Sequence, residues 1–303
     1  MVYLEHERRR DCMLIANEWK EYQLLDASNG QKLEQWGEYL LLRPDPQIIW
    51  DNGDLASKYQ DKIHAIYYRS NKGGGHWQNL KNLPQSWLVH YHDLTFCIKQ
   101  MGFKHTGLFP EQAVNWQFMM QKIKNSHRSI KVLNLFGYTG AATVACLKAG
   151  ASVTHVDASR GMVDWCKENV KVNHLEQAPV RYLVDDVLKF VKREIRRGNH
   201  YDAIVMDPPS YGRGANGEVW NIEQNLAELI QLCKQLLSEK PLFFLINSYT
   251  TGLSATVLQN LLQLIIQPTY PGKISCGEIG LPIKANSLLL PCGIYGRWED
   301  SHD

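Results

Sequence analysis

The sequence has little excess of charge of either sign. Its 303 residues include 33 Lys and Arg against 31 Asp and Glu, which gives a formal net charge of +2. Proteins that bind nucleic acid through a general positive field carry a much larger surplus of basic residues. The balance excludes a histone-like binder, so any contact with a nucleic acid has to come from local patches.

Long apolar runs and paired cysteines are also missing. No segment approaches the roughly 18 apolar residues of a membrane-spanning helix, and no apolar stretch follows the arginines at 8–10, as a secretory signal requires. The seven cysteines are scattered singly, without a Cys-x-x-Cys pair or a metal-ligand spacing. We therefore expect a soluble cytoplasmic protein with reduced thiols, and neither a membrane nor a metal among its partners.

The composition can support a large folded chain. Hydrophobic residues make up 44% of it and charged residues 21%, which is enough to bury a sizeable core. The chain is about twice the usual length of a domain, and its character changes near residue 106. We therefore expect an N-terminal domain over residues 1–105 and a second domain over residues 106–303.

Residues 1–105 predict a small domain made mostly of β-strands. Segments rich in Trp, Tyr and β-branched residues are separated by turn signals such as Asn29-Gly30 and the Asp-Asn-Gly at 51–53. Its tryptophans can stack on nucleic-acid bases, but aromatic residues more often form the core of such a unit. Contact with a substrate stays open as an alternative for Trp36, Trp50, Trp77 and Trp87.

Beyond residue 106, short apolar runs alternate with amphipathic stretches of helical length. This alternation is typical of βαβ crossovers and predicts an α/β fold, a doubly wound Rossmann-like sheet with helices on both faces. In such sheets the ligand binds beyond the carboxyl ends of the strands, so the residues after each run are candidates for a site. The runs are residues 130–136, 152–156, 180–184, 203–206 and 242–246.

Glycines follow the first run and an acid follows the second. Gly137 and Gly140 permit a turn that brings backbone N–H groups close to a ligand, although such glycines more often serve the turn alone. Asp157 can accept hydrogen bonds from the two hydroxyls of a ribose, or it can cap the next helix. The spacing favours a nucleoside ligand, and the lack of Gly-x-Gly-x-x-Gly disfavours a dinucleotide.

Acids also follow the third and fourth runs. Asp185 and Asp186 can accept from an adenine amino group, and capping of the following helix explains them equally well. The fourth run ends in Asp-Pro-Pro-Ser at 207–210, where two prolines fix φ and remove two N–H donors. The Asp207 carboxylate and the backbone carbonyls then form a set of acceptors that suits a planar amino group, although Pro-Pro also marks ordinary turns.

Together these motifs resemble class I S-adenosylmethionine-dependent methyltransferases. The resemblance rests on Asn134-Leu-Phe-Gly-Tyr-Thr-Gly140, Asp157, Asp185-Asp186 and Asp207-Pro-Pro-Ser. More closely, the chain resembles the group related to the bacterial 23S rRNA large-subunit methyltransferases, to which Lys104-His-Thr-Gly-Leu-Phe-Pro-Glu-Gln112 is also similar. Many of these relatives carry an RNA-binding module of the PUA type, whereas here we expect only the β-rich domain before residue 106.

The resemblance implies a role for each matching residue. Asp157 would bind the ribose hydroxyls of S-adenosylmethionine, and Asp186 would meet the adenine amino group. Asp207 and Pro208 would face the methyl acceptor. The remaining residues would contact the cofactor: Phe109 and Gln112 by closing over it, and Gly137, Tyr138, Thr139 and Gly140 by lining its methionine end.

The resemblance also implies an RNA substrate, with ribosomal RNA favoured. Relatives that methylate carbon-5 of cytosine use a cysteine thiolate, commonly after the fifth strand, where this chain reads Asn247-Ser248-Tyr249-Thr250. We therefore expect methylation of a base nitrogen. Two alternatives stay open: a methyltransferase that acts on a protein or a small molecule, and a non-catalytic RNA-binding module of the same fold.

Three further patterns concern contacts outside these motifs. His90 and His92 alternate as on a strand, but without further ligands they do not predict a metal site. Arg213, just after the double proline, is well placed to touch a phosphate or base near the methyl acceptor. Five basic residues share one face of a predicted helix, which either contacts RNA or is a solvated helix face. They are Lys189, Lys192, Arg193, Arg196 and Arg197.

Overall fold

The computed structural model describes residues 13–70, 74–213 and 217–301. These residues form two compact units that interleave along the sequence. The larger unit contains residues 13–14, 114–279 and 293–301, and the smaller unit contains residues 15–113 and 280–292. None of the helices in the described ranges combines the length and the apolar character that crossing a membrane requires.

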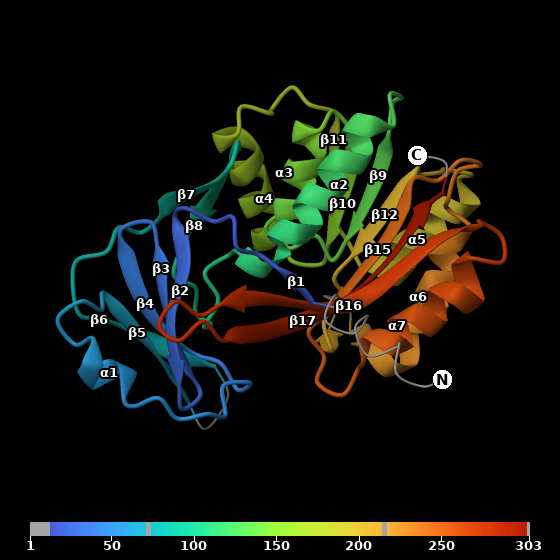
Figure 1. The fold of residues 1–303 in the computed structure, drawn as a ribbon. Coiled ribbons are helices and arrows are strands. Elements are labelled where there is room, and N and C mark those ends of the chain that lie inside the picture. The colour runs from blue at the N-terminus through green and yellow to red at the C-terminus, as the bar shows by residue number, and fades with distance from the viewer. Residues whose placement is uncertain (1–12, 71–73, 214–216, 302–303) are drawn as a thin grey trace, which may run out of the picture. The chain divides into compact units, whose positions relative to one another are not determined.

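The larger unit is built on an eight-stranded sheet (Figure 1). Five neighbouring strands of this sheet run parallel to one another, and the strand beside the last of these five pairs antiparallel with it. In spatial order the strands are β1 (Met13–Ile15), β16 (Gly272–Pro282), β17 (Leu289–Asp300), β15 (Phe243–Ser248), β12 (Ala203–Met206), β9 (Lys131–Leu135), β10 (Ser152–Asp157) and β11 (Val180–Val184).

Helices cover both faces of the parallel strands (Figure 1). The chain moves from β9 through β10 to β11 toward one edge, and then returns to β12 and β15 on the other side of β9. Because crossovers between parallel strands are right-handed, this reversal puts α3 and α4 on one face and α5 and α6 on the other. The helices are α2 (Ala113–Asn125), α3 (Ala141–Lys148), α4 (Arg160–Val172), α5 (Val187–Arg196), α6 (Ile222–Lys234) and α7 (Ala255–Leu261), which continues as a π-helical turn over Leu262–Ile266.

This arrangement confirms the doubly wound α/β fold. The five apolar runs become β9, β10, β11, β12 and β15, within two residues of the predicted bounds. They are mostly apolar because a parallel strand with helices on both faces has little contact with water. Phe190 of α5, Leu229 of α6 and Phe244 of β15 pack in the same core, each 0% exposed.

The smaller unit is β-rich, as expected. It contains a five-stranded sheet and a separate two-stranded one, with a core that includes Leu33, Leu42 and Ile66. The elements are β2 (Tyr22–Ser28), β3 (Gln31–Trp36), β4 (Tyr39–Pro44), α1 (Leu55–Lys58), β5 (Ala65–Arg69), β6 (Gly75–Asn79), β7 (Trp87–Tyr91), β8 (Leu94–Ile98) and a 3₁₀ turn, η2 (Pro110–Gln112).

The four tryptophans of the smaller unit serve its packing. Trp36 is 0% exposed and Trp87 is 9% exposed. Trp50 and Trp77 are half-buried, and their indole nitrogens donate to the carbonyls of Ala27 at 3.0 Å and of Met101 at 2.9 Å. The interpretation as core residues is therefore confirmed for Trp36 and Trp87, whereas Trp50 and Trp77 are partly exposed and have backbone partners.

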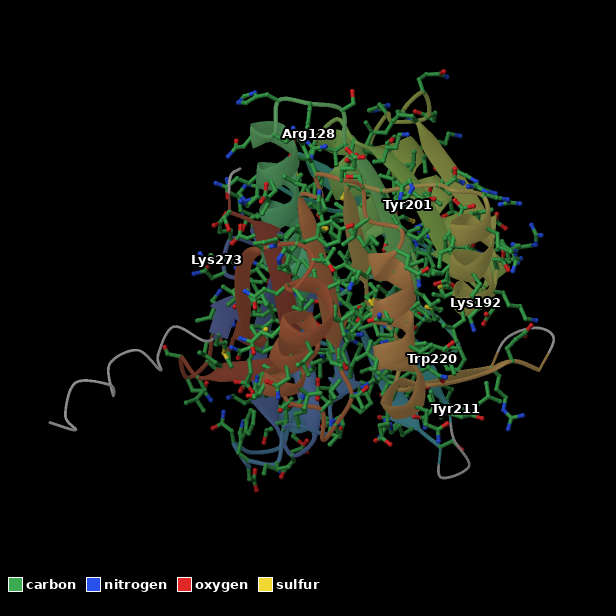
Figure 2. The ribbon with its side chains drawn as sticks, turned by 90° about the vertical axis from the view of Figure 1, so that its right-hand side faces the viewer. Arg128, Lys192, Tyr201, Tyr211, Trp220 and Lys273 are labelled. Carbon is green, nitrogen blue, oxygen red and sulfur yellow. The ribbon has the colours of Figure 1, made fainter. Side chains whose placement is uncertain are left out.

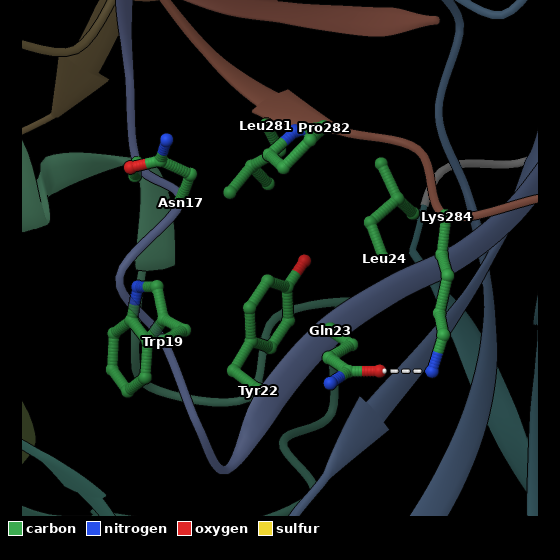
Figure 3. Close-up of a pocket in the computed structure, with 9 residues that line it drawn as sticks. Asn17, Trp19, Tyr22, Gln23, Leu24, Leu281, Pro282 and Lys284 are labelled. Carbon is green, nitrogen blue, oxygen red and sulfur yellow. Dashed lines mark hydrogen bonds between the residues drawn. The ribbon is translucent and has the colours of Figure 1, made fainter. Parts of the chain in front are cut away.

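A late segment of the chain completes the smaller unit. Lys284 N donates to the carbonyl of Leu24 at 2.9 Å, and Ile283 forms a bridge with the same residue. A cavity of about 330 Å³ lies between these segments, where Lys284 Nζ donates to Gln23 Oε1 at 2.9 Å (Figure 3). The boundaries of the two compact units therefore differ from those of the predicted domains, 1–105 and 106–303. The separate functions of the two predicted domains stay a prediction.

Candidate active site

The carboxyl ends of β12, β9, β10 and β11 meet at one edge of the sheet. Asp207 N donates to the carbonyl of Leu135 at 3.4 Å, and Gly137 N donates to that of Val156 at 3.0 Å. Because neighbouring strands lie about 4.8 Å apart, these four ends form a row about 14 Å long. The strand order reverses between β9 and β12, which is where ligands bind in doubly wound sheets.

The turn after β9 has an unusual backbone. Phe136, Tyr138 and Gly140 have φ values of 56°, 51° and 84°, all in the left-handed region. A non-glycine residue seldom adopts this conformation, which costs about 1–3 kcal/mol and tends to occur at functional sites. Three N–H groups of the turn donate within the protein: Gly137 N to the carbonyl of Val156 at 3.0 Å, Tyr138 N to Asp157 Oδ2 at 2.9 Å, and Gly140 N to the carbonyl of Gly137 at 3.0 Å. These hydrogen bonds hold the left-handed backbone in place, and contact of the turn with the methionine end of a cofactor stays a prediction.

The two glycines of this turn are required by what lies beneath them. A Cβ atom on Gly137 would lie 2.5 Å from Nδ1 of His155, and one on Gly140 would lie 2.8 Å from the Cβ of Cys166. The structural interpretation of the glycines is thus correct. It is compatible with ligand binding, since the same packing holds the backbone of the turn in place.

A buried polar cluster supports the turn, and the sequence analysis missed it. His155 of β10 is 0% exposed, and its Nδ1 lies 2.9 Å from Oγ1 of Thr143. The Thr143 hydroxyl in turn accepts a hydrogen bond from Asn134 Nδ2 at 2.9 Å. Burial lowers the pKa of His155 to about 4, so the ring is neutral at pH 7. The only signal in the sequence was a histidine inside an otherwise apolar strand.

Asp157 ends β10 and links the turns on either side of it. Its Oδ2 accepts from Tyr138 N at 2.9 Å, and its Oδ1 accepts from Ser159 N at 2.8 Å. Burial raises the pKa of Asp157, and the two N–H groups oppose this rise. Each carboxylate oxygen can accept a second hydrogen bond. The side chain is therefore oriented by the backbone and retains the capacity to accept from a ribose diol.

Asp185 and Asp186 both have structural partners. Asp186 is the N-cap of α5, where its Oδ1 accepts from Lys189 N at 2.9 Å. Asp185 forms an ion pair with Arg193, and its N–H donates to the carbonyl of Asp157 at 3.0 Å. The capping interpretation is correct for Asp186. A contact between its other oxygen and an adenine stays a prediction.

The Asp-Pro-Pro-Ser corner after β12 is held by hydrogen bonds to its later residues. The carbonyl of Pro209 accepts from Trp220 Nε1 at 2.6 Å, and that of Ser210 accepts from Ile222 N at 3.1 Å. These two carbonyls are therefore engaged, contrary to the expectation that the whole corner offers acceptors. Within the described ranges, no N–H group donates a hydrogen bond to the carbonyl of Pro208.

Trp220 connects this corner with the turn after β9. It lies on β14 (Val219–Asn221), which pairs antiparallel with β13 (Tyr211–Arg213). Its ring centroid is 5.0 Å from that of Phe136, so one side chain contacts both candidate motifs. Figure 2 shows Trp220 and Tyr211 at the end of the unit opposite to Arg128. The sequence analysis did not single out Trp220, because nothing along the chain indicates this contact.

Phe109 and Gln112 belong to the smaller unit, where Phe109 directly precedes η2 and Gln112 is its last residue. The preceding segment is tied down by Arg43, whose Nη1 donates to the carbonyl of Lys104 at 2.8 Å. Arg43 itself forms a buried ion pair with Glu34 at 2.6 Å. Closure of Phe109 and Gln112 over the cofactor stays a prediction.

The basic face of α5 is largely neutralised by acids. In the described ranges, four of its five residues form ion pairs, and one of the acids, Glu194, is 0% exposed. This observation favours the interpretation as a structural, solvated helix face over contact with RNA. The pairs are Lys189–Glu218, Lys192–Glu228, Arg193–Asp185 and Arg197–Glu194.

The cysteines of the larger unit that the structure describes are poor nucleophiles. Burial raises the pKa of Cys146 to about 12 and that of Cys276 to about 11. It also raises the pKa of Cys166, next to the turn after β9, and of Cys233. These thiols stay protonated at neutral pH, and only the thiolate attacks.

The two histidines at strand spacing have individual acidic partners. His90 Nδ1 lies 2.9 Å from Glu21, and His92 Nε2 lies 2.8 Å from Glu18. Among the residues that the structure describes, no group of three or more His, Cys, Asp or Glu side chains is arranged to hold a metal ion.

Comparison with known families identifies the family of this chain. The model of the family described as S-adenosylmethionine-dependent methyltransferase matches residues 41–254. The chain belongs to this family. The match includes the turn after β9, Asp157, Asp186 and the Asp-Pro-Pro-Ser corner.

Solved structures and curated proteins agree with this assignment. The methyltransferase is 35% identical to the SAM-dependent methyltransferase from Agrobacterium tumefaciens, with a TM-score of 0.89 over 95% of this chain and 93% of that one. It shares its fold with SMU.776, which was solved in complex with SAH, at 19% identity and a TM-score of 0.67 over 93% and 76% of the two chains. The ribosomal RNA large subunit methyltransferase K/L of Syntrophotalea carbinolica is 31% identical over 183 residues, or 60% of this chain and 25% of that protein.

The methyltransferase thus spans about a quarter of the length of the first curated relatives it matches. Its edge residues fit S-adenosylmethionine by their chemistry. The Asp157 carboxylate, oriented by Tyr138 N and Ser159 N, suits the ribose diol.

Proposed function

We propose that this methyltransferase modifies RNA at a base nitrogen, with ribosomal RNA as the favoured substrate. Curated relatives named ribosomal RNA large subunit methyltransferase K/L support this proposal. Because the chain covers only part of their length, the substrate is argued from the residues that face the acceptor.

The acceptors of the Asp-Pro-Pro-Ser corner carry the proposal. The Asp207 carboxylate and the Pro208 carbonyl are acceptor groups at the switch point of the sheet, next to the turn after β9. A planar amino or ring N–H group that donates to such oxygens keeps its lone pair directed away from them. The engaged carbonyls of Pro209 and Ser210 hold the corner rigid, which favours a fixed orientation of the acceptor nitrogen.

S-adenosylmethionine would supply a sulfonium methyl group, whose carbon a nitrogen lone pair attacks in line, so that the N–C bond forms as the C–S bond breaks and S-adenosylhomocysteine leaves. In this proposal the residues of the chain bind and orient the reactants. Asp157 holds the ribose, Asp186 the adenine amino group, and the turn at 137–140 the methionine end. Phe109 and Gln112 exclude water from the cofactor. Asp207 orients the acceptor and takes its proton after transfer, directly or through water.

The state of the thiols supports a nitrogen as the methylated atom. Methylation of cytosine carbon-5 needs a thiolate to activate the ring. Burial raises the pKa of Cys166, near the turn after β9, and the segment after β15 contains serine and threonine instead of cysteine. A base nitrogen needs no such activation.

The test is methyl transfer from radiolabelled S-adenosylmethionine to an extract of cells that lack the enzyme. We expect the label in RNA, and digestion of that RNA to nucleosides followed by mass spectrometry should identify an N-methylated base. Label that survives treatment of the extract with RNase would instead support a protein or a small molecule as the acceptor. Binding of S-adenosylmethionine and RNA without any transfer would support the non-catalytic alternative.

A further inference from the structure

We propose that one face of the β13–β14 ribbon binds a single-stranded nucleotide next to the methyl acceptor. This face, called the outer face, carries Tyr211, Arg213 and Val219, and also Asn221, whose side chain caps α6. Tyr211 would stack on a base, and Arg213 would bind the adjacent phosphate. The inference rests on the proposed RNA methyltransferase function and adds to it the residues that select the strand.

The ribbon has two different faces. Tyr211 pairs with Asn221, Gly212 with Trp220 and Arg213 with Val219. Because paired residues of an antiparallel ribbon point to the same side and successive residues alternate, Tyr211, Arg213 and Val219 share one side. The exposures agree: Tyr211 is 52% and Val219 is 55% exposed, whereas Trp220 on the other side is 7% exposed.

The inner side attaches the ribbon to the candidate active site. Trp220 donates to the carbonyl of Pro209 and packs on Phe136, as described above. Glu218, which directly precedes β14, forms an ion pair with Lys189 of α5. Gly212 lies on the same side, since a Cβ there would be in ordinary contact with Pro209 at 3.7 Å and with Trp220 at 3.8 Å. The orientation of the outer face is therefore set by the motif that faces the acceptor.

The outer face lies close to that motif. Tyr211 follows Ser210 directly and is four residues beyond Asp207, a separation of at most about 14 Å. Figure 2 shows Tyr211 beside Trp220 on the ribbon. A substrate whose reactive group meets Asp207 can therefore touch Tyr211 with a neighbouring part.

The chemistry of the outer face indicates a nucleotide. Arg213 Nε donates to the hydroxyl of Tyr211 at 3.1 Å, and its guanidinium carbon is 6.0 Å from the ring centroid, so the two side chains form one unit. Within the described ranges, Arg213 forms no ion pair, whereas four basic residues of α5 do. An exposed aromatic ring can stack on the flat face of an unpaired base, and a cation without an acidic partner beside it can bind the phosphate of that nucleotide.

The experiment compares the wild type with Tyr211→Ala, Tyr211→Phe and Arg213→Gln, using total RNA from cells that lack the enzyme. Methyl incorporation at rising RNA concentration gives an apparent KM and kcat. We expect Tyr211→Ala to raise KM for RNA about 10-fold and Tyr211→Phe to restore it, because stacking needs the ring. Affinity for S-adenosylmethionine, measured by calorimetry, should not change. Leu264→Ala is the control, since Leu264 is 76% exposed elsewhere in the unit.

The salt dependence separates the two roles. A lost phosphate contact lowers the slope of log affinity against log salt by about 0.7 for single-stranded RNA. We expect this change for Arg213→Gln and an unchanged slope for Tyr211→Ala. A merely structural role of the ribbon would not produce this difference.

The outcomes distinguish the inference from the function on which it rests. If the wild type methylates RNA and Tyr211→Ala has an unchanged KM, the inference is wrong and the proposed function stands. If the wild type transfers no methyl group to RNA, the proposed function is wrong. The assignment to a nucleotide is also wrong if a variant of the outer face loses affinity for S-adenosylmethionine. It is wrong as well if such a variant impairs a methyl transfer to protein that survives RNase treatment.

Discussion

Gly137 and His155 pack so closely that no side chain fits between them. Nδ1 of the imidazole would lie 2.5 Å from a Cβ on Gly137. The histidine is fully buried and bonded to Thr143, so it cannot move aside without breaking that contact. The turn that we assign to the methionine end of the cofactor is thus supported from inside the sheet.

Gly137→Ala should therefore destabilise the protein and weaken its binding of S-adenosylmethionine. Overpacking of a well-filled interior costs about 1–3 kcal/mol. Urea denaturation gives the free energy of unfolding, and calorimetry gives the affinity. Gly161→Ala is the matched control, because a Cβ there lies in α4 and meets only Ser159 Oγ at 3.9 Å. Alanine should be tolerated at that position, and an equal loss in both variants would contradict the argument.

Asp157→Ala should weaken S-adenosylmethionine binding with little effect on kcat at saturation. A hydrogen bond to a charged group contributes about 1.5–3 kcal/mol, which corresponds to about 10- to 150-fold in Kd. The control is Asp164→Ala, which removes an exposed acid of α4 that pairs with Lys167. Unchanged affinity of the Asp157 variant, measured by calorimetry, would remove this residue from the site.

Asp207→Ala should leave the affinity for S-adenosylmethionine nearly intact and lower kcat about 100-fold, the scale for loss of substrate positioning. Asp207→Asn keeps an acceptor oxygen without the charge and should retain intermediate activity. Single-turnover methylation of RNA at saturating cofactor is the measurement. Equal rates in the wild type and both variants would exclude contact between Asp207 and the acceptor.

His155 should make the protein less stable in acid. Burial lowers its pKa from 6.5 to about 4, so the unfolded chain binds a proton at a higher pH than the folded one. Stability is therefore complete above pH 6.5 and falls as the pH drops toward 4. One pKa unit equals about 1.4 kcal/mol, so the full loss is about 3 kcal/mol.

Urea denaturation between pH 7.5 and 4.5 tests this prediction, with His155→Gln as the comparison. The variant should lose less stability over this range, while His105, whose pKa burial also lowers to about 4, contributes equally to both proteins. An NMR titration of the wild type is a second readout. A His155 resonance that titrates near pH 6.5 would show that the ring is not held neutral by burial.

The residues around the corner show where reasoning from the sequence stopped. Asp207 and the two prolines were identified because prolines restrict the backbone wherever they occur. Trp220 was missed because its contacts with Pro209 and Phe136 join three separate segments. The basic face of α5 appeared available to RNA until the structure brought Glu218 and Glu228 to it.

The sequence alone determined the local elements of this methyltransferase and the chemical type of its ligand. Apolar runs between amphipathic stretches specified β9, β10, β11, β12 and β15, since a strand covered on both faces is mostly apolar. Only the tertiary structure decided which strands became neighbours, which carbonyls the corner uses internally, and that residues 280–292 complete the smaller unit. These features depend on contacts between segments far apart in the chain, and such contacts leave no periodic pattern in the residues on either side.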